Sequence, residues 1–129
     1  MNSYLLFFSI VLLSILILDL SWINLFFKYR FFPMIVTIQK SPVVINPYYF
    51  FIAYIILTTL VFILIPKCSS PAEAFLIGFL VYAVYDSTNL ATITDWNLVN
   101  AIIDSVWGGV LFIIIYSIYK VFFLLNPVI

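Results

Sequence analysis

Four long apolar segments, separated by short polar breaks, occupy most of this 129-residue chain. We place them at about residues 4–27, 47–65, 72–91 and 97–123, and each approaches the roughly 20 apolar residues that a membrane-spanning helix needs. Hydrophobic residues make up 67% of the chain and charged residues only 8%, whereas about a quarter of a soluble domain is charged. We therefore expect one all-α membrane domain, residues 1–129, with four transmembrane helices in an antiparallel bundle and the lipid bilayer as its surroundings.

The ends of these segments carry helix signals. Ser70, Pro71 and Glu73 predict an N-cap, a first helical residue and a favourable first-turn acid for the third helix. Asp95 is the expected N-cap of the last helix, and Trp96 is interpreted as an interface anchor. The first segment lacks the basic start and small-residue cleavage site of a signal peptide, so we interpret it as a retained span.

Residues 28–46 are expected to form a loop, partly extended or interfacial, because Pro33 and Pro42 interrupt a short apolar run. An even number of spans places both chain ends on one side of the membrane. Lys28, Arg30 and Lys40 lie in this loop, and the positive-inside rule then favours a cytoplasmic location for it.

Polar residues inside the apolar segments are the candidate functional residues. A charged side chain at membrane depth costs roughly 2.5–3.5 kcal/mol on insertion scales, so such residues usually have a role. Three of them are acids, Asp19, Asp86 and Asp104. They lie at similar expected depths, near helix ends that face the same side of the membrane, which predicts an inward-facing polar cluster. The candidate substrate- or ion-binding residues are Asp19, Asp86, Asn89 and Asp104, and the supporting residues are Trp22, Tyr82, Tyr85, Asn100 and Trp107.

Several kinds of site are excluded by composition. The chain has no histidine and one cysteine, Cys68, which excludes a Ser-His-Asp triad, a Cys-His pair and His- or Cys-rich metal sites. Five basic and five acidic residues cancel, so nothing indicates binding to nucleic acid. No cofactor and no catalytic residue are expected, and whether the acids bind a metal ion stays open.

The chain resembles a family of small, mostly bacterial, predicted membrane proteins, the domain of unknown function 2177. The resemblance rests on four motifs that occur in order: Asp19-Leu-Ser-Trp22, Tyr85-Asp-Ser-Thr-Asn-Leu-Ala-Thr92, Trp96, and Asp104-Ser-Val-Trp-Gly108. It implies a four-span protein and points to Asp19, Asp86, Asn89, Asp104 and Trp107. It implies no activity.

Three functions remain open. The first is a small cation or proton transporter or channel that uses the acids as oxygen ligands or proton carriers, assembled as a homo-oligomer or with a membrane partner protein. The second is a structural or assembly protein of a cellular or viral membrane, with the acids joining helices. The third is an intramembrane hydrolase built on Asp86 and Asp104, but the Gly-x-Gly-Asp motif of intramembrane aspartyl proteases is missing, so an enzyme is the least favoured.

Overall fold

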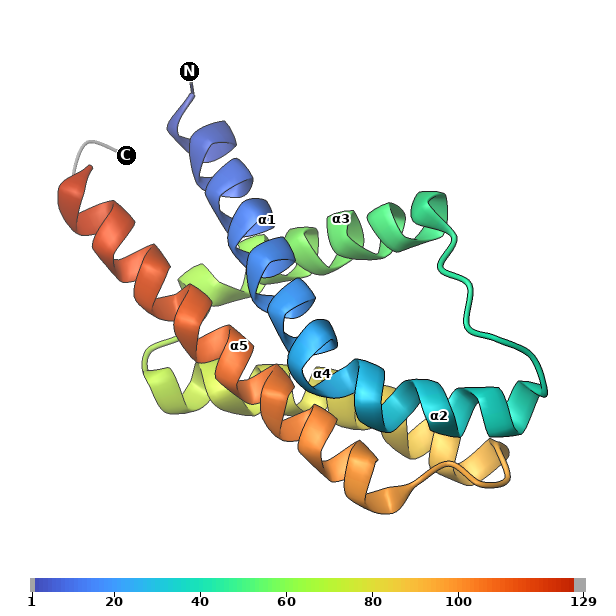
Figure 1. Ribbon diagram of the computed structural model, residues 1–129. Helices are drawn as coiled ribbons and strands as arrows, with labels where there is room; N and C mark the ends of the chain where they lie inside the picture. Colours follow the sequence, from blue (N-terminus) through green and yellow to red (C-terminus); the bar gives the residue numbers. More distant parts are fainter. Residues whose placement is uncertain (1, 127–129) are drawn as a thin grey trace.

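The computed structural model describes residues 2–126, and every regular element in this part of the chain is a helix. A π-helical turn, η1 (Ile23–Phe27), joins the first two helices, and a 3-10 turn, η2 (Ile65–Lys67), extends the third. The five α-helices in Figure 1 are α1 (Ser3–Trp22), α2 (Lys28–Gln39), α3 (Pro47–Leu64), α4 (Pro71–Thr92) and α5 (Leu98–Leu125).

Together α1, η1 and α2 form one bent helix, so four helices are long and apolar enough to cross a membrane. The prediction of an all-α protein with four membrane-spanning helices is confirmed. The limits of the spans within the lipid stay a prediction.

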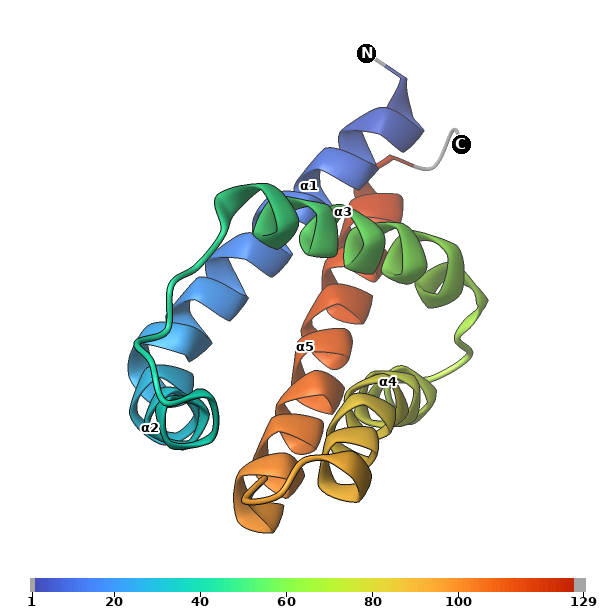
Figure 2. The same ribbon diagram turned by 90° about the vertical axis from the view of Figure 1, so that its right-hand side faces the viewer.

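Helices α4 and α5 run side by side in opposite directions, as both views show (Figures 1 and 2). Helix α1 packs against α3 and α5, and α3 passes behind α1 in Figure 1. The start of α1 meets the end of α5, where the rings of Phe7 and Phe122 lie 5.3 Å apart. Aromatic side chains fill this half of the bundle, since Phe7 also lies 5.8 Å from Phe62 and 5.6 Å from Tyr119. The polar residues gather in the other half.

The segment 28–39 is helical, and our expectation of a loop over these residues was wrong. Pro33 lies inside α2, although proline costs a helix a hydrogen bond and creates a clash. Tertiary packing compensates for this cost: Phe31 is completely buried, stacks on Phe27 at 4.2 Å between centroids and meets the edge of Trp96 at 6.0 Å. The helix ends before Lys40, whose backbone is left-handed with φ 56°.

The N-cap residue predicted from the sequence is the observed one at α4 but not at α5. Ser70 caps α4 by accepting a hydrogen bond from the Glu73 backbone N–H at 3.2 Å, and Glu73 accepts one from the Ser69 N–H at 2.6 Å. The N-cap of α5 is Asn97, whose side chain accepts from the Asn100 N–H at 2.9 Å, so the expectation of Asp95 was wrong. Asp95 instead has a left-handed backbone with φ 70°, a conformation that aspartate tolerates in turns.

All three glycines of the chain lie where α4 meets α5. A Cβ at Gly78 would collide with the Gly108 carbonyl oxygen, and a Cβ at Gly108 would lie 2.6 Å from the Gly78 carbonyl oxygen. At Gly109 the obstacle is the ring of Phe75, 2.5 Å away. The glycines allow α4 and α5 to approach closely, because the two backbones touch where side chains are missing.

This geometry predicts unequal effects of two alanine substitutions. We expect Gly78→Ala to lower the free energy of unfolding by about 1–3 kcal/mol, the usual cost of overpacking, because the opposing backbone cannot rotate away. Gly109→Ala should cost less, because the Phe75 ring can move and alanine favours the helix by roughly 1 kcal/mol over glycine. Unfolding of both variants in a mild neutral detergent measures the difference, and equal losses would contradict the close backbone contact at Gly78.

Candidate functional site

The Asp19 carboxyl, near the end of α1, is contacted by side chains from the three other membrane helices. It is 8% exposed and accepts a hydrogen bond from the Trp107 indole N–H of α5 at 2.8 Å. The side chains of Tyr54 on α3 and Tyr82 on α4 also lie beside it. One buried carboxyl therefore joins all four helices of the bundle.

Asp86 on α4 and Asp104 on α5 form a second group. They are 1% and 5% exposed, and their carboxyls face each other within hydrogen-bonding reach. Asp86 Oδ1 accepts a hydrogen bond from the Trp96 indole N–H at 3.2 Å, while Asp86 Oδ2 has no donor. Two facing carboxyl groups carry no hydrogen between them unless one is protonated, and two carboxylates repel. The pair therefore needs a proton or a cation.

Stacked indole rings link the two groups. The rings of Trp22 and Trp107 are parallel within 1°, with 4.8 Å between centroids. The Trp22 indole nitrogen lies near Asp104. It is buried, and no acceptor is placed to form a hydrogen bond with it. Because Trp107 binds Asp19 and Trp22 approaches Asp104, the indole pair connects the two groups of acids.

A cavity of about 620 Å³ opens beside this cluster. Its polar part comes from α1, α3, α4 and α5, and its remaining walls are apolar residues of η1, α2, α3 and the 40–46 linker. Asp86 lies behind Asp104 and does not line the cavity. The polar lining residues that matter here are Asp19, Trp22, Tyr54, Tyr82, Asp104 and Trp107.

The nearest basic residues contact aromatic rings. The Lys28 ammonium lies 5.5 Å from the centroid of Tyr29, and the Arg30 guanidinium lies 5.9 Å from that of Phe26. Within residues 2–126, the charged or polar side chains that act on the three buried acids are other acids, tyrosines and tryptophans. The cluster thus has no cationic side chain to balance its carboxyls.

Two predicted residues lie outside the cluster. Asn100 is 5% exposed, but its amide N–H donates to the Arg30 carbonyl oxygen at 3.1 Å and so ties α5 to α2. Asn89 lies beside Tyr85 and does not reach the cavity. Tyr85 itself lines the cavity, and its ring meets the edge of Trp96 at 6.2 Å. The site contains the three acids but neither amide.

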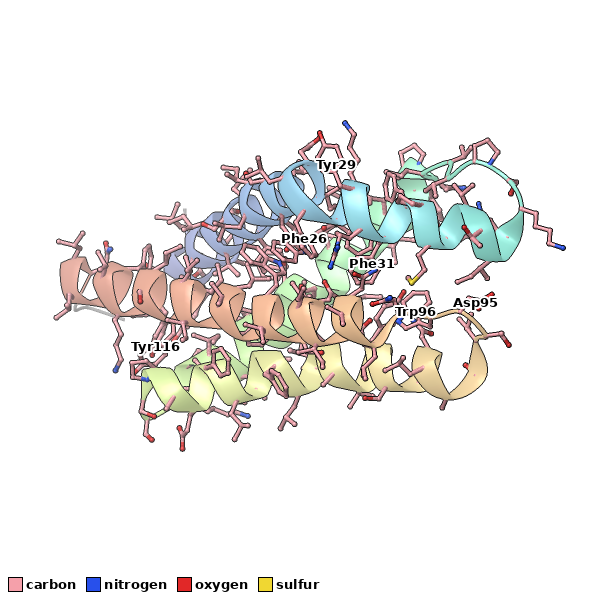
Figure 3. The ribbon with its side chains drawn as sticks, turned by 60° about the horizontal axis from the view of Figure 1, so that its bottom comes forward. Phe26, Tyr29, Phe31, Asp95, Trp96 and Tyr116 are labelled. Atoms are coloured by element: carbon pink, nitrogen blue, oxygen red, sulfur yellow. The ribbon has the colours of Figure 1, made fainter. Side chains whose placement is uncertain are left out.

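Sequence reasoning missed Tyr54, Thr58 and the contact of Trp96 with Asp86. Tyr54 and Thr58 are 8% and 0% exposed, and their spacing of four residues, which places both on one helix face, was the available signal. Trp96 was interpreted only as an interface anchor, yet Figure 3 shows it beside Phe31 of α2, at the turn between α4 and α5. That turn directs its indole back toward Asp86.

The residues present do not form a multidentate metal site. In the described part of the chain, no three acidic, cysteine or histidine side chains come together closely enough to hold a metal ion. A hard divalent ion needs more ligands than two carboxyls supply; calcium, for example, takes six to eight oxygen ligands. Two facing carboxyls therefore suit a proton or a singly charged cation better.

Comparison with protein-family models matches residues 4–126 of the chain to the family described as Predicted membrane protein (DUF2177). No curated protein and no solved structure matches the chain.

The contact between Trp107 and Asp19 predicts a non-additive response to substitution. Trp107→Phe should lower the free energy of unfolding by about 1–3 kcal/mol, because it leaves a buried carboxyl without its donor. In an Asp19→Leu background the same change should cost much less, since no acceptor remains. A double-mutant cycle of unfolding in neutral detergent measures this, and equal costs in the two backgrounds would contradict the interaction.

Proposed function

Because the chain belongs to this family of predicted membrane proteins and is a multi-pass integral membrane protein, we propose that it carries a proton or a small cation across the bilayer. The facing pair Asp86 and Asp104 is the proposed binding site, and Asp19 lines the route. Since no lysine or arginine among residues 2–126 pairs with these acids, release of a bound cation would break no salt bridge within the protein.

The observation that carries this proposal is the unpartnered Asp86 Oδ2. It belongs to a side chain that is 1% exposed, it has no donor, and its carboxyl faces that of Asp104. An ionised group in an apolar interior is costly unless it is paired. A proton or cation between the two carboxyls removes this cost, and intramembrane acids of this kind commonly mark ion pathways.

A cavity lined by one member of the pair and a second hollow one helical turn away on α5 support a route. Asp104 lines the cavity of about 620 Å³. Asn100, one helical turn earlier on α5, lines a second hollow of about 580 Å³ together with Arg30 and Asn97. Four helices enclose little space, so we propose that copies of the chain associate to complete the path.

A structural or assembly role is the second candidate. The hydrogen bonds from Trp107 to Asp19 and from Trp96 to Asp86 join parts of the chain that are 88 and 10 residues apart. Such polar contacts hold membrane helices together, with a measured average of about 0.6 kcal/mol each. In that case the acids would stabilise the bundle or an assembly and would conduct nothing.

Flux measurements in proteoliposomes distinguish the two candidates. We expect proton or monovalent-cation flux in the wild type and its loss in Asp86→Asn, because an amide cannot exchange a proton or balance a cation. Glu73→Gln is the matched control: it makes the same chemical change on the same helix at a fully exposed capping residue, and it should leave flux unchanged.

Size-exclusion profiles check that all three proteins are folded. If the wild type shows no flux for protons or several monovalent cations across a range of pH, or if a folded Asp86→Asn keeps its flux, the transport proposal is wrong. Loss of stability in Asp86→Asn, without flux in the wild type, would support the structural role.

A further inference from the structure

We propose that the cavity beside the acid cluster binds a lipophilic organic cation, with the positive charge at Asp19 and Asp104 and the apolar body along α2 and α3. This inference deepens the proposed function: it rests on the acid cluster being a cation site and names the class of cation that the cavity takes.

The two parts of the cavity differ in chemistry. Asp19 and Asp104 supply carboxyl oxygens at one part, and no lysine or arginine lines it. The walls that lead away from the acids are apolar, and the residues that form them include Phe27, Phe32, Ile35, Ile45, Phe50 and Leu57. A molecule that matches both parts has a positive charge and a large apolar surface.

The aromatic residues around the acids favour an organic cation over a hydrated inorganic one. Trp107 and Tyr82 line the cavity next to the carboxyls, whereas the ring of Trp22 is stacked on Trp107 and Phe26. The faces of tryptophan and tyrosine rings attract alkylammonium and related cations, and this attraction is worth about 2 kcal/mol or more when the site is desolvated. An anionic amphiphile such as a fatty acid would instead place its carboxylate against two acids.

The size and position of the cavity suit such a ligand. Sites for drug-sized molecules measure about 300–1,000 Å³, and this cavity measures about 620 Å³. Val43 and Ile45 of the linker between α2 and α3 form part of its wall, and the intervening Val44 is 86% exposed. Residues 43–45 of the linker are therefore apolar toward the cavity and on the outer surface, which suits the approach of a lipophilic ligand.

The unpartnered buried oxygen is the second observation that points to a ligand. Asp86 Oδ2 has no donor, and the Asp86 carboxyl lies directly behind Asp104, which lines the cavity. A positive charge held at Asp104 therefore also offsets the repulsion from Asp86.

Binding of two ions of matched shape and opposite charge tests the inference. The probes are tetraphenylphosphonium and tetraphenylborate, added to purified protein in neutral detergent and measured by equilibrium dialysis against protein-free micelles. We expect saturable binding of the phosphonium ion and none of the borate. Asp104→Asn should weaken phosphonium binding at least about tenfold, which is about 1.4 kcal/mol.

A pair of phenylalanine substitutions on α3 tests the location independently of the acids. Ala53 lines the cavity, so Ala53→Phe should fill it and weaken phosphonium binding. Ile56→Phe, at a residue that is 63% exposed and outside the cavity, should bind as the wild type does. This pair keeps the test decisive if Asp104→Asn does not fold.

Equal binding of both ions, or unchanged phosphonium binding in folded Asp104→Asn and Ala53→Phe, would overturn the inference. These outcomes are separate from the flux result. Flux without phosphonium binding would refute the organic cation and leave the proposed transport of protons or small cations standing. Charge-selective binding without any flux would support the cavity as a cation site and refute transport.

Discussion

The Asp19 carboxyl is the contact on which the arrangement of the helices depends. In an apolar bundle a carboxyl must find a donor within the protein, and Asp19 finds it in Trp107 of α5. Tyr54 of α3 and Tyr82 of α4 lie beside the same carboxyl. This requirement fixes how α1 is rotated against its neighbours. It also explains why the end of α1 approaches the N-terminal half of α5 at Trp22, whose ring stacks on Trp107.

The second constraint is the close approach of α4 and α5 at their glycines. Backbone contact at Gly78 and Gly108 sets the register of the two helices, and in this register Asp86 and Asp104 face each other. The tight turn at Asp95 then brings the Trp96 indole to Asp86. Neither acid finds a cationic partner there, so the packing that stabilises the bundle brings two carboxyl groups together without a positive side chain beside them.

Much of this arrangement could be predicted from the sequence, because acids within apolar segments are rare and their depth follows from helix geometry. The helices, the Ser70 cap and the grouping of the three acids on neighbouring helices follow in this way. Tyr54 and Thr58 could not be singled out, since hydroxyl residues are common in membrane helices and only packing shows which of them are buried. Asn100 faces α2, a helix that the sequence did not predict because of Pro33. Asn89 lies beside Tyr85 and outside the cavity.

The central claim is that Asp86 and Asp104 act as one pair that lacks a positive charge. A double-mutant cycle of Asp86→Asn and Asp104→Asn, measured as unfolding in neutral detergent at neutral pH, tests it most directly. The account predicts that either single change raises the free energy of unfolding, because an amide donates a hydrogen bond to the remaining carboxyl. The second change should add nothing further, so the coupling energy between the two changes should exceed about 0.5 kcal/mol. Effects that add, or a loss of stability in both single variants, would contradict the pair.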